Sequence, residues 1–381
     1  MIYADNAATT MLSETALAHM LPFLRERYAN ASSSHSFGGM AMRAIGLARG
    51  QIARAVSAKP EEIYFTSGGT EANSWVLRSV TERFPNQSIH IVTSAIEHYS
   101  VLNGCRALEK RGVEVTYLPV NHKGFVSFES VKEAVRPNTR LVTVMLANNE
   151  IGTIQPIGEI GRHLRDIGVL FHTDAVQAVG RIPVDVNALH VDYLSASAHK
   201  FNGAKGTGFL YQRAGKRLPP LLWGGKQEFG ARPGTENVAG VVAAGYALEE
   251  CVMGMEEVAL RIKRLVDITT SILRRKIFDA VIYGGAPKLP GIITLGFAEV
   301  SGESLSDLLG LKEIYVSSGS ACASRAKEPS HVLFALGIVD ENAPSALRIS
   351  YGRHNTENEA ETLAHTLCNI YQKIVHSKAA L

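Results

Sequence analysis

The chain of 381 residues is 46% apolar, which is enough to bury a large core, and its length suggests one large domain with a smaller one. A formal charge of +3 and the lack of long basic blocks argue against a nucleic-acid-binding surface. The longest run of small apolar residues, "VAGVVAAGYAL" at 238–248, is about half of the roughly 20 residues that a membrane-spanning helix needs, so it predicts a core helix. The start, "MIYADNAATT", lacks the basic and apolar regions of a signal peptide, and we expect a cytoplasmic protein without a membrane role.

The cysteines and histidines show no paired ligand spacing. Cys105, Cys251, Cys322 and Cys368 lie far apart and form no CxxC motif, which argues against a disulfide framework or a zinc site built from this chain alone. The 13 histidines include no HExxH motif. We therefore predict no metal site and at most one cysteine with a special role.

From about residue 60, apolar runs typical of strands alternate with amphipathic segments. Strands are expected at "IYFTS", "IHIVTSAIE", "VEVTYLPV", "LVTVMLA", "VLFHTDA", "DYLSAS" and "GTGFLYQ". Several of these runs are apolar throughout, as in strands covered on both faces, so they predict an α/β fold with a mostly parallel sheet. Ligands of such sheets bind beyond the carboxyl ends of the strands, where Asp174 follows "VLFHT".

After about residue 236 the pattern changes to a long helical stretch that we expect to bend near Gly254. Strands near "GIITLGF" and "ALRISYG" follow, with helices near "SLSDLLGL", "SHVLFALG" and "ENEAETLAHTLCNIYQKIV". We predict a large domain of residues 11–250 and a small α/β domain made of residues 1–10 and 251–381. No low-complexity linker separates them, so the two domains should pack together.

A glycine turn joins the first predicted strand to a helix in "FTSGGTEAN". The helix is expected to start at about Thr70, after Gly68 and Gly69. Exposed backbone N–H groups and the positive helix end favour an anion there, most often a phosphate, although a turn that only caps the helix would have the same sequence. The motifs GxGxxG and GxxxxGK[ST] are absent, which excludes the dinucleotide and P-loop patterns.

Lys200 ends the stretch "SASAHK", and taken alone it would be a solvated surface lysine. Together with Asp174 and the glycine turn it suggests pyridoxal 5'-phosphate (PLP), which needs a lysine for a Schiff base, a carboxylate for the pyridine nitrogen and a phosphate site. Ser197 and His199 flank the lysine as candidate phosphate ligands.

Three further polar residues follow predicted strands. His98 starts a helix after "TSAIE", where it could cover the cofactor ring or move a proton, or have only a structural role. Asn149 and Gln177 lie just past strand ends, where their amides could bond a ring hydroxyl or a substrate carboxylate.

The stretch "VSSGSACASRAKEPSHV" surrounds Cys322 with small residues and then with charged ones before a proline, which predicts a loop. A buried, inert thiol is the common alternative for an isolated cysteine. Because Arg325 and Lys327 would favour the thiolate, we predict that Cys322 is reactive.

Separated motifs along the chain resemble, in order and spacing, those of NifS/IscS-like cysteine desulfurases, which are PLP-dependent enzymes of fold type I in the class V aminotransferase group. The resemblance runs from residue 2 to about residue 353. The motifs are "YADNAATT", "SGGTEAN", "ANNEIGTIQPI", "HTDAVQAVG", "SASAHKFNGAKGTG", "RPGTENV" and "SSGSACAS" followed by "EPSHVL".

This resemblance implies roles for the cofactor-binding residues. Lys200 would bind PLP covalently, Asp174 would pair with the pyridine nitrogen, Gln177 would contact the ring hydroxyl, and His98 would stack on the ring and move protons. The phosphate would be held by Gly69, Thr70, Ser197, His199 and, from the second subunit of a homodimer, Thr235.

The resemblance also implies the reaction. Asn149 and Arg348 would bind the carboxylate of L-cysteine, and Cys322 would capture its sulfur as a persulfide, leaving L-alanine. The sulfur would pass to a protein acceptor for iron–sulfur cluster assembly or for thio-modification of tRNA or another molecule, and Cys322 could also ligate a transferred cluster. Phe229 departs from the family, where an arginine is common, so contacts between subunits or with the partner are expected to differ.

Other functions fit the same pattern of residues. An aminotransferase or a selenocysteine lyase could share the fold and the cofactor, although transamination needs no thiol loop. A sulfur carrier or scaffold without turnover is a third alternative, but the presence of Lys200, Asp174 and Cys322 argues against it.

Overall fold

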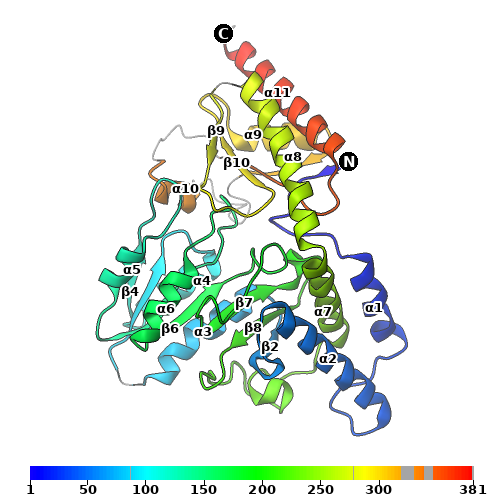
Figure 1. The fold of residues 1–381 in the computed structure, drawn as a ribbon, viewed down its shortest axis with the longest axis vertical. Helices are drawn as coiled ribbons and strands as arrows, with labels where there is room; N and C mark the ends of the chain where they lie inside the picture. Colours follow the sequence, from blue (N-terminus) through cyan, green and yellow to red (C-terminus); the bar gives the residue numbers. More distant parts are fainter. Residues whose placement is uncertain (86, 278, 319–329, 339–345, 380–381) are drawn as a thin grey trace.

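The structure is a computed structural model that describes residues 1–85, 87–277, 279–318, 330–338 and 346–379. Its larger part is built on a seven-stranded sheet, and a smaller part that carries both chain termini packs at one end (Figure 1). The predicted loop around Cys322 lies outside the described residues.

The large sheet has the strand order β2-β8-β7-β6-β5-β3-β4. Its strands are β2 (Ile63–Thr66), β3 (His90–Ser94), β4 (Glu114–Leu118), β5 (Thr139–Thr143), β6 (Leu170–Asp174), β7 (Tyr193–Ser197) and β8 (Gly208–Gln212). Only β8 runs antiparallel to its neighbours. The predicted mostly parallel sheet is therefore confirmed.

Helices cover both faces of this sheet, which explains why most of its strands are buried along almost their whole length. One face packs against α3 (Gly69–Arg83) and α4 (Tyr99–Glu109). The other face packs against a second group of helices, with α1 beside α7. This group comprises α1 (Glu14–Arg25), α2 (Ser36–Ala55), α5 (Phe128–Ala134), α6 (Ile157–Asp166) and α7 (Val238–Met253).

The small part has its own apolar core around a four-stranded antiparallel sheet in the order β12-β13-β10-β9. Its strands are β1 (Ile2–Tyr3), β9 (Val281–Tyr283), β10 (Ile292–Gly296), β11 (Ile314–Tyr315), β12 (Ser317–Ser318) and β13 (Leu347–Ser350). Its helices are α8 (Met255–Lys276), α9 (Gly302–Gly310), α10 (His331–Ala335) and α11 (Glu357–Ala379). The first strand, β1, pairs in parallel with β11, far along the chain.

The predicted bend of the long helical stretch is confirmed, because α7 and α8 meet at Gly254 with an angle of 72°. Helix α7 packs against α1 and α2, whereas α8 packs against α11. The two sides of this bend have separate apolar cores, and β1 pairs with β11 of the small part. We therefore propose domain boundaries near residues 10 and 250.

Helix α7 is mostly buried in the large core, as expected for the run at 238–248. Within the described residues, no single helix is long and apolar enough to cross a membrane. The bent pair α7 and α8 passes that test only when the two helices are joined.

Candidate active site

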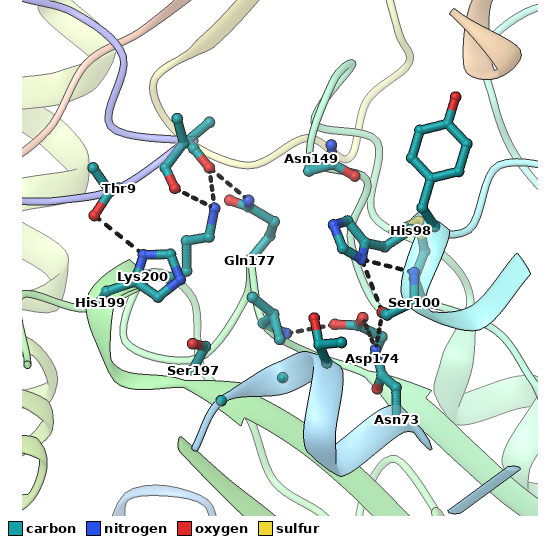
Figure 2. Close-up of a pocket in the computed structure, with 18 of the residues that line it drawn as sticks. Thr9, Asn73, His98, Ser100, Asn149, Asp174, Gln177, Ser197, His199 and Lys200 are labelled. Atoms are coloured by element: carbon teal, nitrogen blue, oxygen red, sulfur yellow. Dashed lines mark hydrogen bonds between the residues drawn. The ribbon is translucent and has the colours of Figure 1, made fainter. Parts of the chain in front are cut away.

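A cavity of about 490 Å³ lies at the carboxyl ends of the parallel strands, between the large sheet and the small part. That is the size range of small-molecule and cofactor sites. Ten of the predicted site residues line it: Gly69, Thr70, His98, Asn149, Asp174, Gln177, Ser197, His199, Lys200 and Arg348. Side chains from separate strands therefore converge on one site (Figure 2).

Thr235 does not line this cavity. It lies in a neighbouring pocket of about 240 Å³ that shares Ser67 and Gly206 with the main one. Its role in the phosphate site of a second subunit stays a prediction.

The glycine turn after β2 leaves the start of α3 open toward the cavity. Gly68 has φ +154°, and a Cβ on Gly69 would come within 2.4 Å of the Val176 side chain, so both positions need glycine. No side chain caps this helix end among the described residues. The first-turn N–H groups of α3 are therefore suited to hold a phosphate, with Ser197 close by.

Asp174 ends β6 as a buried carboxylate that accepts two hydrogen bonds. Its Oδ2 accepts one from Asn73 Nδ2 at 2.6 Å, and its Oδ1 accepts one from Val176 N at 2.9 Å. A carboxylate in this setting favours a cationic partner, which a protonated pyridine nitrogen would supply.

A chain of hydrogen bonds runs from Asp174 to His98 through two residues that the sequence did not single out. Asn73 Nδ2 also donates to Ser100 Oγ at 2.9 Å, and Ser100 Oγ lies 2.8 Å from His98 Nδ1 (Figure 2). Since Ser100 N donates to the same ring nitrogen, Nδ1 is the acceptor, and a neutral His98 carries its proton on Nε2. His98 begins α4 as predicted.

Lys200 follows β7 in a short 3-10 turn and is half-buried. Its Nζ donates hydrogen bonds to two backbone carbonyls of the N-terminal segment, Ala7 O at 2.5 Å and Ala8 O at 2.7 Å (Figure 2). Gln177 Nε2 donates to the same Ala7 carbonyl at 2.9 Å. The backbone at Ala7 and Ala8 therefore positions Lys200, the lysine predicted to bind the cofactor.

The side-chain oxygen of Gln177 shows whether the cavity suits PLP. It is a buried oxygen without a hydrogen-bond partner among the described residues, and such a group destabilises the fold unless a donor reaches it. A ring hydroxyl is such a donor. Together with Lys200, Asp174 and the open end of α3, this acceptor makes the cavity a good fit for PLP.

His199 is held as a neutral imidazole. Burial, followed by the positive charges of Lys200, Lys205 and Arg181, lowers its pKa to about 4. Its Nδ1 lies 3.1 Å from Thr9 Oγ1. The ring can therefore donate a hydrogen bond without adding a positive charge next to the lysine.

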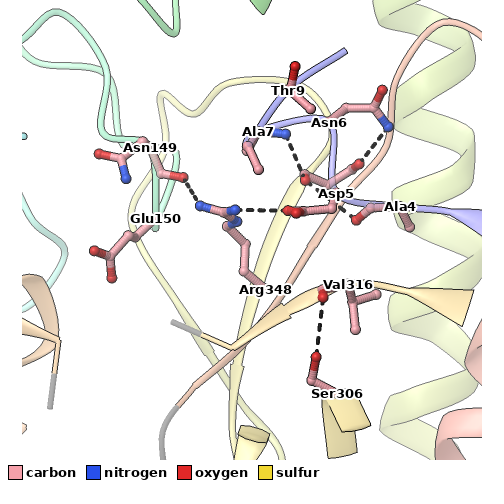
Figure 3. A network of polar contacts seen from close by, with 12 residues as sticks. Ala4, Asp5, Asn6, Ala7, Thr9, Asn149, Glu150, Ser306, Val316 and Arg348 are labelled. Carbon is pink, nitrogen blue, oxygen red and sulfur yellow. Dashed lines mark hydrogen bonds and ion pairs between the residues drawn. The ribbon is translucent and has the colours of Figure 1, made fainter. Parts of the chain in front are cut away.

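Arg348 reaches the cavity from β13 of the small part. Its Nη2 donates to Asp5 Oδ1 at 2.8 Å, and its Nη1 donates to the backbone oxygen of Asn149 at 3.0 Å (Figure 3). The guanidinium is therefore held between the N-terminal segment and the loop after β5. The sequence did not single out Asp5.

The three cysteines within the described residues are buried. Burial raises the pKa of Cys105 to about 12 and that of Cys251 to about 11, so neither forms a thiolate near neutral pH. The prediction that Cys322 is the reactive cysteine concerns a residue outside the described ranges.

The buried His172, two residues before Asp174, is expected to make the stability of the protein depend on pH. Burial lowers its pKa to about 3, and its ring nitrogens lie 2.7 Å from Thr143 Oγ1 and 2.9 Å from Ser195 Oγ. Below pH ~6.5 the unfolded chain binds a proton that the folded protein does not, so this residue should cost up to about 1.4 kcal/mol of stability per pH unit as pH falls.

Urea unfolding between pH 7 and pH 4.5 tests this expectation. His172→Gln should make the loss of stability with falling pH shallower than in the wild type, while His122→Gln, at an exposed position, should not. Equal slopes for His172→Gln and the wild type would show that this histidine is not the buried neutral group.

The sheet, the lysine turn and the convergent cavity define the protein as a fold type I PLP-dependent enzyme. The aminotransferase class-V family matches residues 2–363, and the chain belongs to this family. Enzymes of this family depend on PLP.

Relatives and solved structures agree with that assignment. The chain is 44% identical over 374 residues to cysteine desulfurase IscS of Dictyoglomus turgidum, covering 98% of this chain and 95% of that protein. It is also 44% identical over 375 residues to cysteine desulfurase IscS of Methanosarcina thermophila, covering 98% and 92%. A solved NifS-like protein is 38% identical with a TM-score of 0.91, over 97% of this chain and 99% of that one. A structure titled SspA in complex with cysteine is 34% identical with a TM-score of 0.83, over 93% and 100%.

Proposed function

We propose that the protein is a PLP-dependent cysteine desulfurase that converts L-cysteine into L-alanine and captures the sulfur as a persulfide on Cys322. The observation that carries this proposal is the convergence of Lys200, Asp174, Gln177 and Arg348 on one cavity. The relatives named cysteine desulfurase and the neighbour solved with cysteine support the choice of substrate.

Each residue around the cofactor has a distinct task. Asp174 would hold the positive charge of the ring nitrogen, and Gln177 Oε1 would accept from the ring hydroxyl. The N–H groups of α3, with Gly69, Thr70, Ser197 and His199, hold the phosphate. When bound, PLP supplies the electron sink for the electrons released at the substrate α-carbon.

Substrate binding and proton movement involve the remaining residues of the cavity. Arg348 and Asn149 orient the substrate carboxylate, a task for which a guanidinium fork is well suited. Lys200 would hold the cofactor covalently, and its amine, when free, would take up the α-proton at Nζ. His98 holds or releases a proton at Nε2, oriented by the hydrogen bond at its other nitrogen.

The sulfur step involves Cys322. Its thiolate attacks the substrate sulfur, a sulfur–sulfur bond forms, and the carbon–sulfur bond breaks with its electron pair on the carbon fragment. Protonation of that fragment gives alanine. The persulfide is then passed to a protein acceptor for iron–sulfur cluster assembly or for thio-modification.

We also propose a homodimer in which Thr235 reaches the partner's phosphate site. The segment near Thr235 exposes large apolar side chains, with Trp223 94% exposed and Phe229 53% exposed, which is typical of a surface that another chain covers. A cytoplasmic location remains a prediction.

The substitution Cys322→Ala tests the sulfur step. The variant should retain the visible absorbance of bound PLP and its change on addition of L-cysteine, because no other proposed site residue is altered. Persulfide formation, followed by mass spectrometry of the protein, should be lost. Cys368→Ala is the control, since this thiol is buried in the small core. A persulfide that forms at the wild-type rate without Cys322 would overturn its role.

A further inference from the structure

Helix α10 begins directly beyond the segment that contains Cys322, and two polar contacts tie it to the wall of the cavity. Ser330 Oγ donates to Glu150 Oε2 at 2.5 Å. His331 Nε2 donates to the backbone oxygen of Glu97 at 2.9 Å. Glu97 precedes His98, and Glu150 follows Asn149, so both contacts are made by the loops that carry proposed site residues.

The hydrogen bond between Ser330 and Glu150 is buried, with the two residues 7% and 8% exposed. Ser330 is the N-cap of α10, and its Oγ accepts hydrogen bonds from Val332 N at 3.1 Å and Leu333 N at 3.4 Å. With those acceptor positions filled, its single hydroxyl proton goes to Glu150. The same serine therefore starts the helix and fastens it to the cavity wall.

Glu150 is itself held in place from two sides. Its N–H donates to Asn148 Oδ1 at 2.8 Å, and its carbonyl accepts from Thr294 Oγ1 of β10 at 2.5 Å. Its side chain points away from the Arg348 guanidinium (Figure 3). Burial raises the pKa of Glu150 to about 7, while the Ser330 hydroxyl, Arg348 and His98 act against burial and favour the carboxylate.

An apolar contact adds to the two polar ones. Residues of and beside α10 form a core cluster with residues of the two loops that bear Glu97 and Glu150. The members of this cluster include Ile96, Met145, Ile151, Val332, Leu333 and Leu336. The start of α10 is therefore fixed relative to the cavity and not only relative to the small part.

We propose that Glu150 and Ser330 are positioning residues for the sulfur-transfer step: their hydrogen bond fixes the start of α10 and with it one end of the segment that carries Cys322. The proposal rests on the proposed function. Cys322 precedes Ser330 by eight positions, a contour length of at most about 29 Å, so the place of Ser330 limits where the thiol can reach. The pair acts through Cys322, and the hydrogen bonds described for Arg348 go to Asn149 O and Asp5 Oδ1 rather than to this pair.

Two single variants and their combination test the pair. Glu150→Ala removes the acceptor and keeps the helix cap, whereas Ser330→Ala removes both. Each should slow persulfide formation on Cys322 in a single turnover by about tenfold, as expected for the loss of one buried hydrogen bond that positions the segment. The double variant should be no slower than the slower single variant, because the two residues act as one unit.

Matched variants and a second measurement separate positioning from general damage. Ser330→Thr and Glu150→Gln keep a donor and an acceptor, so they should recover most of the rate. Ser301→Ala removes an equivalent N-cap from α9 and should leave the rate unchanged. The absorbance change of bound PLP on adding L-cysteine should stay within about twofold of wild type in Glu150→Ala, whereas amide hydrogen exchange at residues 331–335 should become faster.

The outcomes are distinct. A wild-type rate of persulfide formation in Glu150→Ala, or equal losses in the absorbance change and in persulfide formation, would overturn the positioning role. If the wild-type protein formed no persulfide at all, the proposed function would fail and this role with it. Faster exchange in α10 of Glu150→Ala would then still support the hydrogen-bonded attachment of the helix, and unchanged exchange would refute it.

Discussion

Replacing Lys200 with alanine is expected to slow alanine formation from L-cysteine by more than about a thousandfold, because one side chain supplies both the covalent link to the cofactor and a proton acceptor at the substrate α-carbon. His98, the other proposed proton carrier, is not placed to take over this role (Figure 2). The Lys200 amine points toward Ala7 and Ala8 on the N-terminal segment, and His98 lies on the other side of the cavity. The measurement is the steady-state rate of alanine release with PLP in excess.

The fold should survive this change. Lys200 is half-buried, the Ala7 carbonyl keeps its hydrogen bond from Gln177 Nε2, and the cavity has room for water in place of the amine, so the unfolding midpoint in urea should change little. Lys123→Ala, at an exposed position, is the control and should keep the full rate. More than about a hundredth of the wild-type activity in Lys200→Ala would contradict the assignment of this lysine.

The second large effect concerns stability and the buried ion pair of Arg49 with Glu228. Arg49 Nη1 and Nη2 donate to the two carboxylate oxygens at 2.8 and 2.7 Å, and Phe65 N donates to Glu228 Oε2 at 2.8 Å. Arg49→Ala would leave the Glu228 carboxylate buried without its countercharge. We expect the free energy of unfolding to fall by about 3–5 kcal/mol, measured by urea denaturation.

The ion pair also holds an unusual turn. Glu228 and Phe229 both have left-handed backbone angles, φ +46° and +57°, which are strained for residues other than glycine. The Arg49 guanidinium lies over the rings of Phe65 and Phe229, 4.7 and 5.2 Å from their centroids. Within one chain, then, Phe229 packs on Arg49, and whether it alters contacts between subunits stays a prediction.

An exposed ion pair provides the control for this experiment. Lys263 and Asp267 are 2.9 Å apart on α8 with side chains 71% and 60% exposed, so Lys263→Ala should change the free energy of unfolding by less than about 1 kcal/mol. If Arg49→Ala also changed the free energy of unfolding by less than about 1 kcal/mol, the Glu228 carboxylate could be hydrated or protonated at little free-energy cost. That result would contradict the stabilising role assigned to this ion pair.

The sequence predicted those site residues that follow long apolar strands. Asp174 ends one buried strand and Lys200 lies just beyond another, and parallel strands bring their carboxyl ends to one edge of the sheet, so the order of apolar runs predicts that the two residues lie close together. His98 and Gln177 were found for the same reason.

Other contacts could not be predicted from local patterns. Asn73 lies in the middle of α3, where a polar residue has no distinctive pattern, yet the helix places it against Asp174. The acceptors for Lys200 are backbone carbonyls of two alanines, which carry no side-chain signal. The pairing of β1 with β11 joins distant parts of a chain whose two-residue strands show no periodicity. Each of these contacts depends on tertiary structure.

The most direct test of the central claim is the reaction of the purified, PLP-loaded protein with L-cysteine and a thiol reductant, with alanine and sulfide measured in the same sample. For a cysteine desulfurase, the visible absorbance of bound PLP should change on mixing, and alanine and sulfide should then appear in equal amounts. An absorbance change that yields a keto acid, or no sulfide, would contradict desulfuration and indicate another amino-acid reaction on this fold. A protein that binds no PLP would contradict the whole assignment of the cavity.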